Sequence, residues 1–177
     1  NARPLLDGHV DIASLEEFHQ HCTLEGFTFD YVLDRAVGVW QLCQMALAAG
    51  RAGRSMTDGR RGAVIDRWDK TAVQMITPSN SWNWQSSRSF RKRLHALRVR
   101  FVDADNNFDS GAELLVFNDG YDKSNATFME SIEFPGVTSS ANIWKLGRYY
   151  LGQLELRPEI YSCSMDLEHM AFSRGDL

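Results

Sequence analysis

The chain has 177 residues, a formal net charge of -4, and 44% apolar and 24% charged side chains. This is the composition of an ordinary globular protein, long enough to bury a core without a metal or a disulfide network. The charge gives no case for a nucleic-acid partner, and no apolar run approaches the ~20 residues that cross a bilayer, so we expect no membrane insertion. The three cysteines, Cys22, Cys43 and Cys163, contain no CxxC pair and favour free thiols made in a reducing compartment.

The first part of the chain, residues 8–78, is predicted to be a helix-strand-helix-hairpin unit. A capping box at residues 14–17 indicates that a short helix starts there, with Ser14 as its cap. Residues 27–33 mix aromatic, β-branched and polar side chains as a half-buried strand does. A helix is predicted over 39–50, followed by a hairpin turning at Asp58-Gly59, because both residues tolerate positive φ. A further strand is predicted within 71–76.

Residues 79–92 are polar with two tryptophans, which indicates a linker between two subdomains. The second subdomain, 93–177, is predicted to be β-barrel-like or a sheet with one long helix. Its first strand, 94–102, has apolar side chains on one face, with Arg98 and Arg100 on the other. The later elements are predicted as strands at 112–117 and 127–134, a helix at about 139–157, and one or two strands within 159–172. The expected fold class is therefore α+β.

Two stretches contain metal-ligand side chains in unsuitable patterns. His9, Asp11, His19, His21 and Cys22 lie close in sequence, but His19 and His21 would point about 200° apart on a helix. Residues 103–109 alternate oxygen side chains as an EF-hand loop does, but Phe108 stands where that loop requires glycine and Leu114 where it requires glutamate. We favour solvated side chains for the first stretch and a hairpin turn for the second, and we expect no metal.

The densest basic cluster lies in residues 88–100, which contain Arg91, Lys92, Arg93, Arg98, Arg100 and a single aromatic residue, Phe90. A strand divides this charge between two faces, which favours a solvated or subunit-contact surface over a nucleic-acid patch. Glu168 and His169 are adjacent and would face opposite ways on a strand. Neither a P-loop nor a GxSxG motif occurs. We therefore expect no catalytic residues, no cofactor and no enzymatic activity.

Several segments, read in order, follow the pattern of one known family. They are residues 27–31 (FTFDY), 39–52 (VWQLCQMALAAGRA), 58–66 (DGRRGAVID), 77–80 (TPSN), 89–90 (SF), 97–103 (LRVRFVD), 106–107 (NN), 133–138 (EFPGVT), 147–150 (GRYY), 157–159 (RPE) and 174–177 (RGDL). Together they resemble the hub region of the host-specificity (tip attachment) proteins of lambda-like phages. Each segment is a turn, a cap or a strand edge, but their order extends over nearly the whole chain.

The resemblance implies a structural part of a phage or prophage tail tip, or baseplate hub, that links the tail tube to the receptor-binding end and catalyses no reaction. It implies a homotrimer in the full-length protein, contacts with other tail-tip proteins, assembly in the bacterial host cytoplasm and a final place at the virion tail tip. The chain is expected to be an internal piece of that protein. Apolar side chains are typical of permanent interfaces, so Trp82 and Trp84, with Arg98 and Arg100, are the candidate contact residues.

Two other functions are weighed against a structural role. Trp68, Trp82 and Trp84 lie near polar side chains (Asn80, Asn83 and Gln85) and could stack on sugar rings, as in a carbohydrate-binding module of a tail or surface protein. A peptidoglycan-degrading hub enzyme would need a paired acid and nucleophile, and no sequence feature supports that pair. The first alternative remains open at this point.

Overall fold

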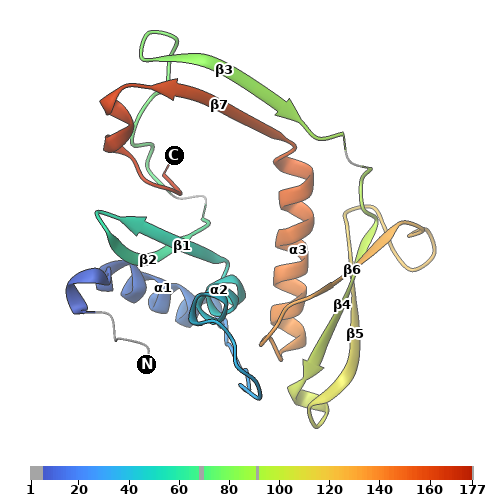
Figure 1. The fold of residues 1–177 in the computed structure, drawn as a ribbon. Coiled ribbons are helices and arrows are strands. Elements are labelled where there is room, and N and C mark those ends of the chain that lie inside the picture. Colours follow the sequence, from blue (N-terminus) through green and yellow to red (C-terminus); the bar gives the residue numbers. More distant parts are fainter. Residues whose placement is uncertain (1–5, 68–69, 91, 177) are drawn as a thin grey trace. The chain divides into compact units, whose positions relative to one another are not determined.

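The computed structural model describes residues 6–67, 70–90 and 92–176 (Figure 1). Within these ranges the protein is α+β, with three α-helices and seven strands, which confirms the predicted fold class. The strands form three small sheets, ordered β1-β2, β3-β7 and β5-β4-β6. None of these sheets closes into a barrel. Of the two alternatives predicted for the second subdomain, a barrel-like fold or a sheet with one long helix, the structure therefore has the sheet.

The chain divides into two compact units that are interleaved in sequence. Unit 1 comprises the described residues of Asn1–Gly26, Val37–Gln85 and Ser162–Leu177, and unit 2 comprises those of Phe27–Ala36 and Ser86–Tyr161. The sequence predicted two consecutive subdomains, 8–78 and 93–177. Two segments therefore belong to the opposite unit from the one expected, residues 27–36 and residues 162–177.

Unit 1 is built from two helices and a hairpin. Its elements are η1 (Asp7–His9), α1 (Ile12–Glu25), α2 (Val39–Ala49), β1 (Ala52–Thr57), β2 (Arg60–Ile65) and η3 (Leu167–Ala171). The predicted hairpin is confirmed, because β1 and β2 pair antiparallel and its turn residues Asp58 and Gly59 have φ of 52° and 75°. The second predicted helix is also confirmed, ending just before Gly50.

The start of α1 corrects the predicted capping box. The N-cap is Asp11, whose carboxylate accepts a hydrogen bond from the Ser14 amide at 3.3 Å. Ser14 lies inside the helix, where its hydroxyl donates to the Asp11 carbonyl at 3.0 Å and accepts from the Ala63 amide at 3.1 Å. A Cβ added at Gly62 would lie 2.2 Å from the Ser14 hydroxyl oxygen, so glycine permits this close approach of β2 to α1.

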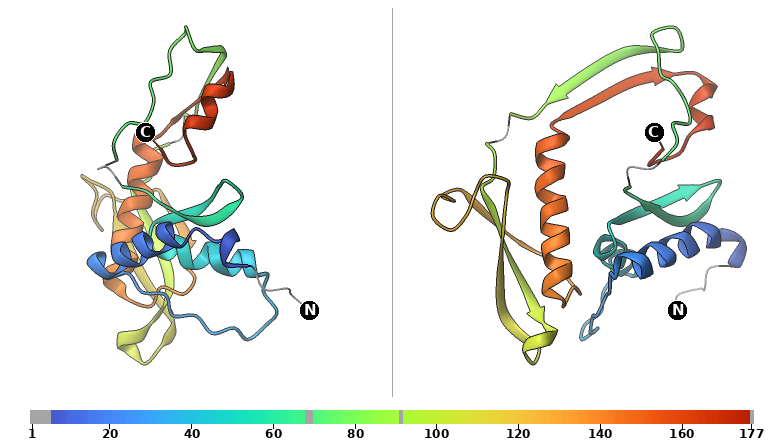
Figure 2. Two further views of the ribbon diagram at one scale, coloured as in Figure 1. Left: turned by 90° about the vertical axis from the view of Figure 1, so that its left-hand side faces the viewer. Right: turned by 180° about the vertical axis from the view of Figure 1, so that it is seen from behind.

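Unit 2 holds a three-stranded sheet covered on one face by a helix (Figure 2). The central strand β4 (Ala96–Asp103) pairs antiparallel with β5 (Asp109–Phe117) and parallel with β6 (Met129–Glu133). The helix α3 (Ser140–Leu156) packs against β4 and β5. A Cβ at Gly147 would lie 2.8 Å from the Val116 side chain, so the helix backbone approaches the sheet directly.

The core of unit 2 lies between α3 and the sheet. Its largest fully buried side chains are Leu97, Val99, Val116 and Ile143. Along β4, Leu97, Val99 and Phe101 are buried while Arg98 and Arg100 are exposed, which confirms the predicted alternation. Burial of one such aliphatic side chain stabilises a fold by about 1.5–3 kcal/mol, so this interface is the main apolar stabilisation of the unit.

Two predicted strands are wrong, because residues 27–33 and 71–76 form no strand. In the first segment, polar groups form hydrogen bonds with the loop at residues 136–138 instead of with a neighbouring strand. The Asp30 amide donates to the Gly136 carbonyl at 2.7 Å, and the Thr138 hydroxyl donates to the Asp30 carboxylate at 2.9 Å. The Phe29 ring fills the space beside Gly136, where an added Cβ would lie 2.3 Å from it. The segment after residue 70 ends in a turn, in which the Asn80 amide group donates to the Met75 carbonyl.

The linker expected at residues 79–92 contains a strand, β3 (Ser81–Arg88), which pairs with β7 (Glu159–Met165). Figures 1 and 2 show these two strands side by side. Trp82 and Trp84 alternate with Asn83 and Gln85, but the stretch is polar overall, and every residue of β3 after Ser81 is exposed. Such a strand is recognised only by its partner, which lies far along the chain.

Candidate functional site

The two candidate tryptophans lie on β3, in the part of the strand that belongs to unit 1. Trp82 is 46% exposed and Trp84 is 47% exposed. Asn83 between them has a φ of 53°, which interrupts the regular pleat. The spacing of two residues therefore does not by itself place both indoles on one face. The strand presents two large aromatic surfaces, each half open to solvent.

The two candidate arginines lie on the face of the unit 2 sheet that α3 does not cover. Arg100 donates to Glu113 of the paired strand at 2.9 Å, and the Arg98 Nε lies 3.9 Å from the other oxygen of the same carboxylate. Their cross-strand partners on β6, Ser131 and Glu133, share this face. The basic charge is thus partly neutralised by carboxylates, and the face is a mixed polar surface.

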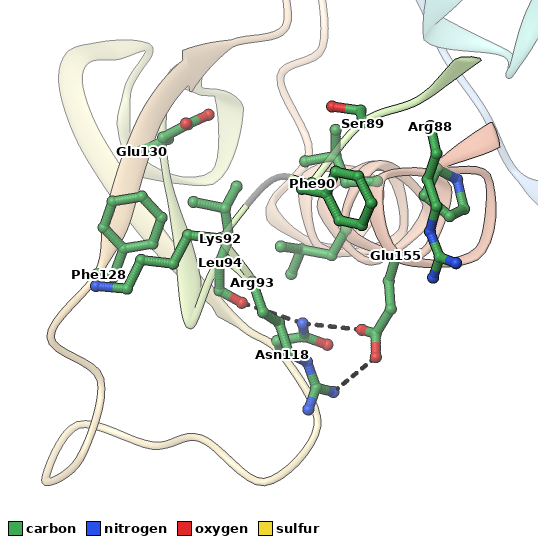
Figure 3. Close-up of a pocket in the computed structure, with 13 residues that line it drawn as sticks. Arg88, Ser89, Phe90, Lys92, Arg93, Leu94, Asn118, Phe128, Glu130 and Glu155 are labelled. Atoms are coloured by element: carbon green, nitrogen blue, oxygen red, sulfur yellow. Dashed lines mark hydrogen bonds and ion pairs between the residues drawn. The ribbon is translucent and has the colours of Figure 1, made fainter. Parts of the chain in front are cut away.

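A groove of about 490 Å³ opens in unit 2 beside the segment that follows β3 (Figure 3). The sequence did not indicate this groove. Its lining residues are Arg88, Ser89, Phe90, Lys92, Arg93, Leu94, Asn118, Phe128, Glu130, Leu151, Leu154, Glu155 and Pro158. Four residues of the predicted basic cluster, Arg88, Phe90, Lys92 and Arg93, line it, while Arg91 is outside the described residues.

Most of the cations along this groove already have partners. Arg88 lies 3.3 Å from Glu159, and Arg93 lies 3.1 Å from Glu155. The Lys92 ammonium lies 4.8 Å from the centre of the Phe128 ring, and Figure 3 shows the two side chains together. The groove is therefore lined both by apolar side chains and by cations that already have partners.

A buried amide holds one end of the groove in place. The Asn118 side chain donates to the Leu94 carbonyl at 3.1 Å and to Glu155 at 3.2 Å. His95, which follows Leu94 in the chain, stacks on Tyr121 with ring centres 4.0 Å apart. Its Nδ1 accepts hydrogen bonds from the Thr127 and Phe128 amides, so the proton of the neutral ring is on Nε2. Neither role was visible in the sequence, because each joins segments far apart in the chain.

The two carboxylates that line the groove, Glu130 and Glu155, do not form a pair. Figure 3 shows Glu130 and Glu155 on opposite sides of it, and Glu155 is engaged by Arg93 and Asn118. In β7, just after the C-terminal end of α3, the Tyr161 hydroxyl donates to Glu159, and this hydrogen bond raises the pKa of Tyr161. Glu155 and Glu159 are thus both held by neighbouring side chains.

The ligand-type residues of the first unit are distributed along its surface. Burial lowers the pKa of His21 and raises that of Cys22, which lies beside Gly50. In residues 6–67, 70–90 and 92–176, no group of three histidine, cysteine or acidic side chains is placed to hold a metal ion. None of the helices in these ranges has the length and apolarity required to cross a bilayer.

The oxygen-rich turn after β4 forms a short 3-10 helix, η2 (Ala104–Asn106), at the end of the β4-β5 hairpin. The Asp103 carboxylate accepts from the Asp105 amide at 3.1 Å, and the Asp109 carboxylate accepts from the Gly111 amide at 2.9 Å. These bonds are those of a turn.

A comparison of the sequence with models of known protein families finds none that matches, and a search of curated proteins likewise finds no match.

Proposed function

We propose that the chain is a structural component of a phage or prophage tail tip, where it links the tail tube to the receptor-binding end. It acts through contacts with copies of itself, as a homotrimer in the full-length protein, and with other tail-tip proteins. The first support is the resemblance to lambda-like tail hubs, whose segments follow in order from residue 27 to residue 177. The second is the surface that the strand β3 presents.

The exposure of β3 carries the proposal. A two-stranded ribbon is at best marginally stable by itself in water, and three strands or a packed face are needed for stability. Here the last seven residues of β3 are exposed, among them Trp82 and Trp84, and the ribbon contains only β3 and β7. Tryptophan is enriched in the energetically dominant centres of protein interfaces. A partner surface on β3 explains why this strand exposes two such side chains.

The arginine pair of unit 2 has a lesser role in this proposal. Arg98 and Arg100 are 46% and 59% exposed and share one carboxylate, so their ion pairs contribute little to stability. Charges at the rim of an interface mainly affect the association rate and partner choice. We assign Arg98 and Arg100 to such a rim.

The proposal is tested by the mass of the chain in solution, measured by light scattering over a concentration series. We expect a trimer, and we expect Trp82→Ala/Trp84→Ala to weaken its association by about tenfold or more, because interface tryptophans contribute at least ~1–2 kcal/mol. The control is Trp144→Ala, which removes an indole that is 54% exposed on α3. A wild-type chain that stays monomeric at high concentration would contradict self-assembly.

The same two exposed indoles keep a carbohydrate-binding module as the alternative, since sugar rings stack on exposed aromatic faces. Trp68, the third tryptophan of that hypothesis, lies outside the described residues. A glycan array decides between the two functions. Binding that Trp82→Ala/Trp84→Ala abolishes, by a chain that remains monomeric, would replace the assembly proposal with the carbohydrate-binding one.

A further inference from the structure

An exposed aromatic residue between two arginines marks one surface of unit 1. Trp40, at the start of α2, is 43% exposed, and the guanidinium groups of Arg61 and Arg54 lie 4.1 and 5.8 Å from its ring centre. Met56, which is 67% exposed, is the cross-strand partner of Arg61 and lies on the same face of the hairpin as Arg54. We call this set, with the exposed Val39, the Trp40 patch.

The Trp40 patch carries positive charge that its own unit does not neutralise. In the part of the chain that the structure describes, neither Arg54 nor Arg61 forms an ion pair with a carboxylate. Arginine, tryptophan and methionine are the side chains most enriched at protein interfaces. The patch therefore has the composition of a contact surface suited to bind acidic groups, on a protein whose net charge is -4.

The end of the β4-β5 hairpin in unit 2 has the opposite character. Asp103, Asp105 and Asp109 lie here, and among the described residues none of the three pairs with a cation. Between them Phe108 is 66% exposed and has a φ of 57°. A bulky side chain seldom adopts this conformation, and such residues persist where the surrounding structure or a function requires them. We call these four residues the acidic tip.

We propose that the acidic tip of one copy docks on the Trp40 patch of a second copy. The proposal deepens the proposed function, on which it rests, because it names a contact through which copies assemble. Carboxylates of the tip pair with Arg54 and Arg61, and the Phe108 ring covers Trp40 and Met56. Such a contact joins two different surfaces, so the first copy still has a free patch and the second still has a free tip. Contacts of this kind form a ring when the rotation between successive copies closes and an open filament when it does not; the trimer expected for the hub requires closure after three copies.

Charge exchange between the two surfaces tests the docking on the full chain. The patch reversal is Arg54→Glu/Arg61→Glu, and the tip reversal is Asp105→Lys/Asp109→Lys. Each reversed chain places like charges against each other, so we expect its self-association to be at least about tenfold weaker than that of the wild type. The matched control is Arg60→Glu, on the same hairpin but on its other face, opposite Thr57. We expect it to leave association within about twofold of wild type.

The decisive measurement mixes the two reversed chains, one of them fluorescently labelled, and follows anisotropy. A tip-to-patch contact between unlike chains is complementary, so we expect the two reversed chains to bind each other as a pair while neither binds itself. A ring of three must include one contact between like chains, so the mixture is not expected to recover the full trimer. Circular dichroism checks that each variant is folded. Mutual binding by the two reversed chains supports docking between copies.

Three results would overturn the docking in distinguishable ways. If both reversed chains assemble like wild type, the docking is wrong and the proposed function stands. If both lose association and the two reversed chains do not bind each other, the reversals act within each chain or on its fold, and docking between copies is again wrong. If the wild-type chain is itself monomeric, the self-assembly of the proposed function fails first and the docking fails with it.

Discussion

The two units differ in how they hold their helices. In unit 2, α3 packs on a sheet through side chains that are fully buried, such as Leu97 and Ile143. In unit 1, α1 has no buried residue at all, and α2 has only Leu47 and Ala49. The α1 helix is joined to β2 by the Ser14 hydroxyl and by the close approach at Gly62. The difference teaches that α3 is held in unit 2 mainly by apolar burial. In the described part of unit 1 the buried apolar side chains are few and come from α2 and β2, such as Leu47 and Ile65, and α1 is joined to β2 by polar and backbone contacts.

The largest test of this difference removes one leucine from each unit. Leu97→Ala empties a fully buried position of unit 2, and we expect a loss of about 2–5 kcal/mol in the free energy of unfolding. Leu15→Ala, at a position of α1 that is 37% exposed, should cost less than about 1.5 kcal/mol. Chemical denaturation of both variants measures the contrast. Equal losses would show that α1 is buried as deeply as the unit 2 core.

A second test addresses the segment 27–36, which unit 2 holds without a strand. Gly136 has a φ of 76°, and a Cβ there would lie 2.3 Å from the Phe29 ring. Gly136→Ala therefore adds both backbone strain and a clash, and we expect a loss of about 2–3 kcal/mol. The control is Gly120→Ala, whose φ is 84° but whose Cβ would meet nothing within 4 Å.

The difference between these two variants isolates the packing of Phe29 from the backbone strain that they share. Thermal denaturation gives both values, and backbone amide exchange of residues 27–36 should accelerate in Gly136→Ala alone. Identical stability of the two variants would mean that the segment is not held against this loop.

A smaller effect is expected at the polar connection of unit 1. Ser14→Ala removes the acceptor of the Ala63 amide, and we expect a loss of about 1 kcal/mol. Thr23→Ala on the same helix is the control, since the Thr23 hydroxyl bonds only to the His19 carbonyl one turn earlier. Chemical denaturation compares the two. A Ser14→Ala variant as stable as Thr23→Ala would show that this hydroxyl does not join α1 to β2.

The smallest effect concerns reactivity and not stability at neutral pH. Burial raises the pKa of Cys22, which lowers its thiolate fraction at a given pH. In a Cys43→Ser/Cys163→Ser background, alkylation of Cys22 should rise at higher pH in the folded chain than in denaturant. Because the folded state retains this proton to a higher pH than the unfolded state, the chain loses stability as the pH rises past the thiol pKa of the unfolded state. Overlapping profiles in buffer and denaturant would contradict the burial of this thiol.

Much of the fold was predictable where the signal is local. The Asp58-Gly59 turn, the helix over 39–50 and the alternation along β4 each follow from a few adjacent residues. The strand β3 was missed, because the alternation of Trp82 and Trp84 with polar residues is short and lies in a polar stretch that favours a linker; the pairing with β7 identifies the strand. The groove of unit 2 was missed for the same reason, since Asn118 and Glu155 come from separate segments.

The sequence by itself determined the α+β class, the best-marked helices and hairpin, and the residue types available for contact. These depend on periodicity, turn residues and composition, which act over a few positions. Only the tertiary structure decided which side chains remain exposed, such as Trp82, Trp84 and Phe108, and that residues 27–36 and 162–177 exchange units. Burial and pairing depend on contacts between distant segments, and their free energy is set by the surfaces that meet in the folded chain.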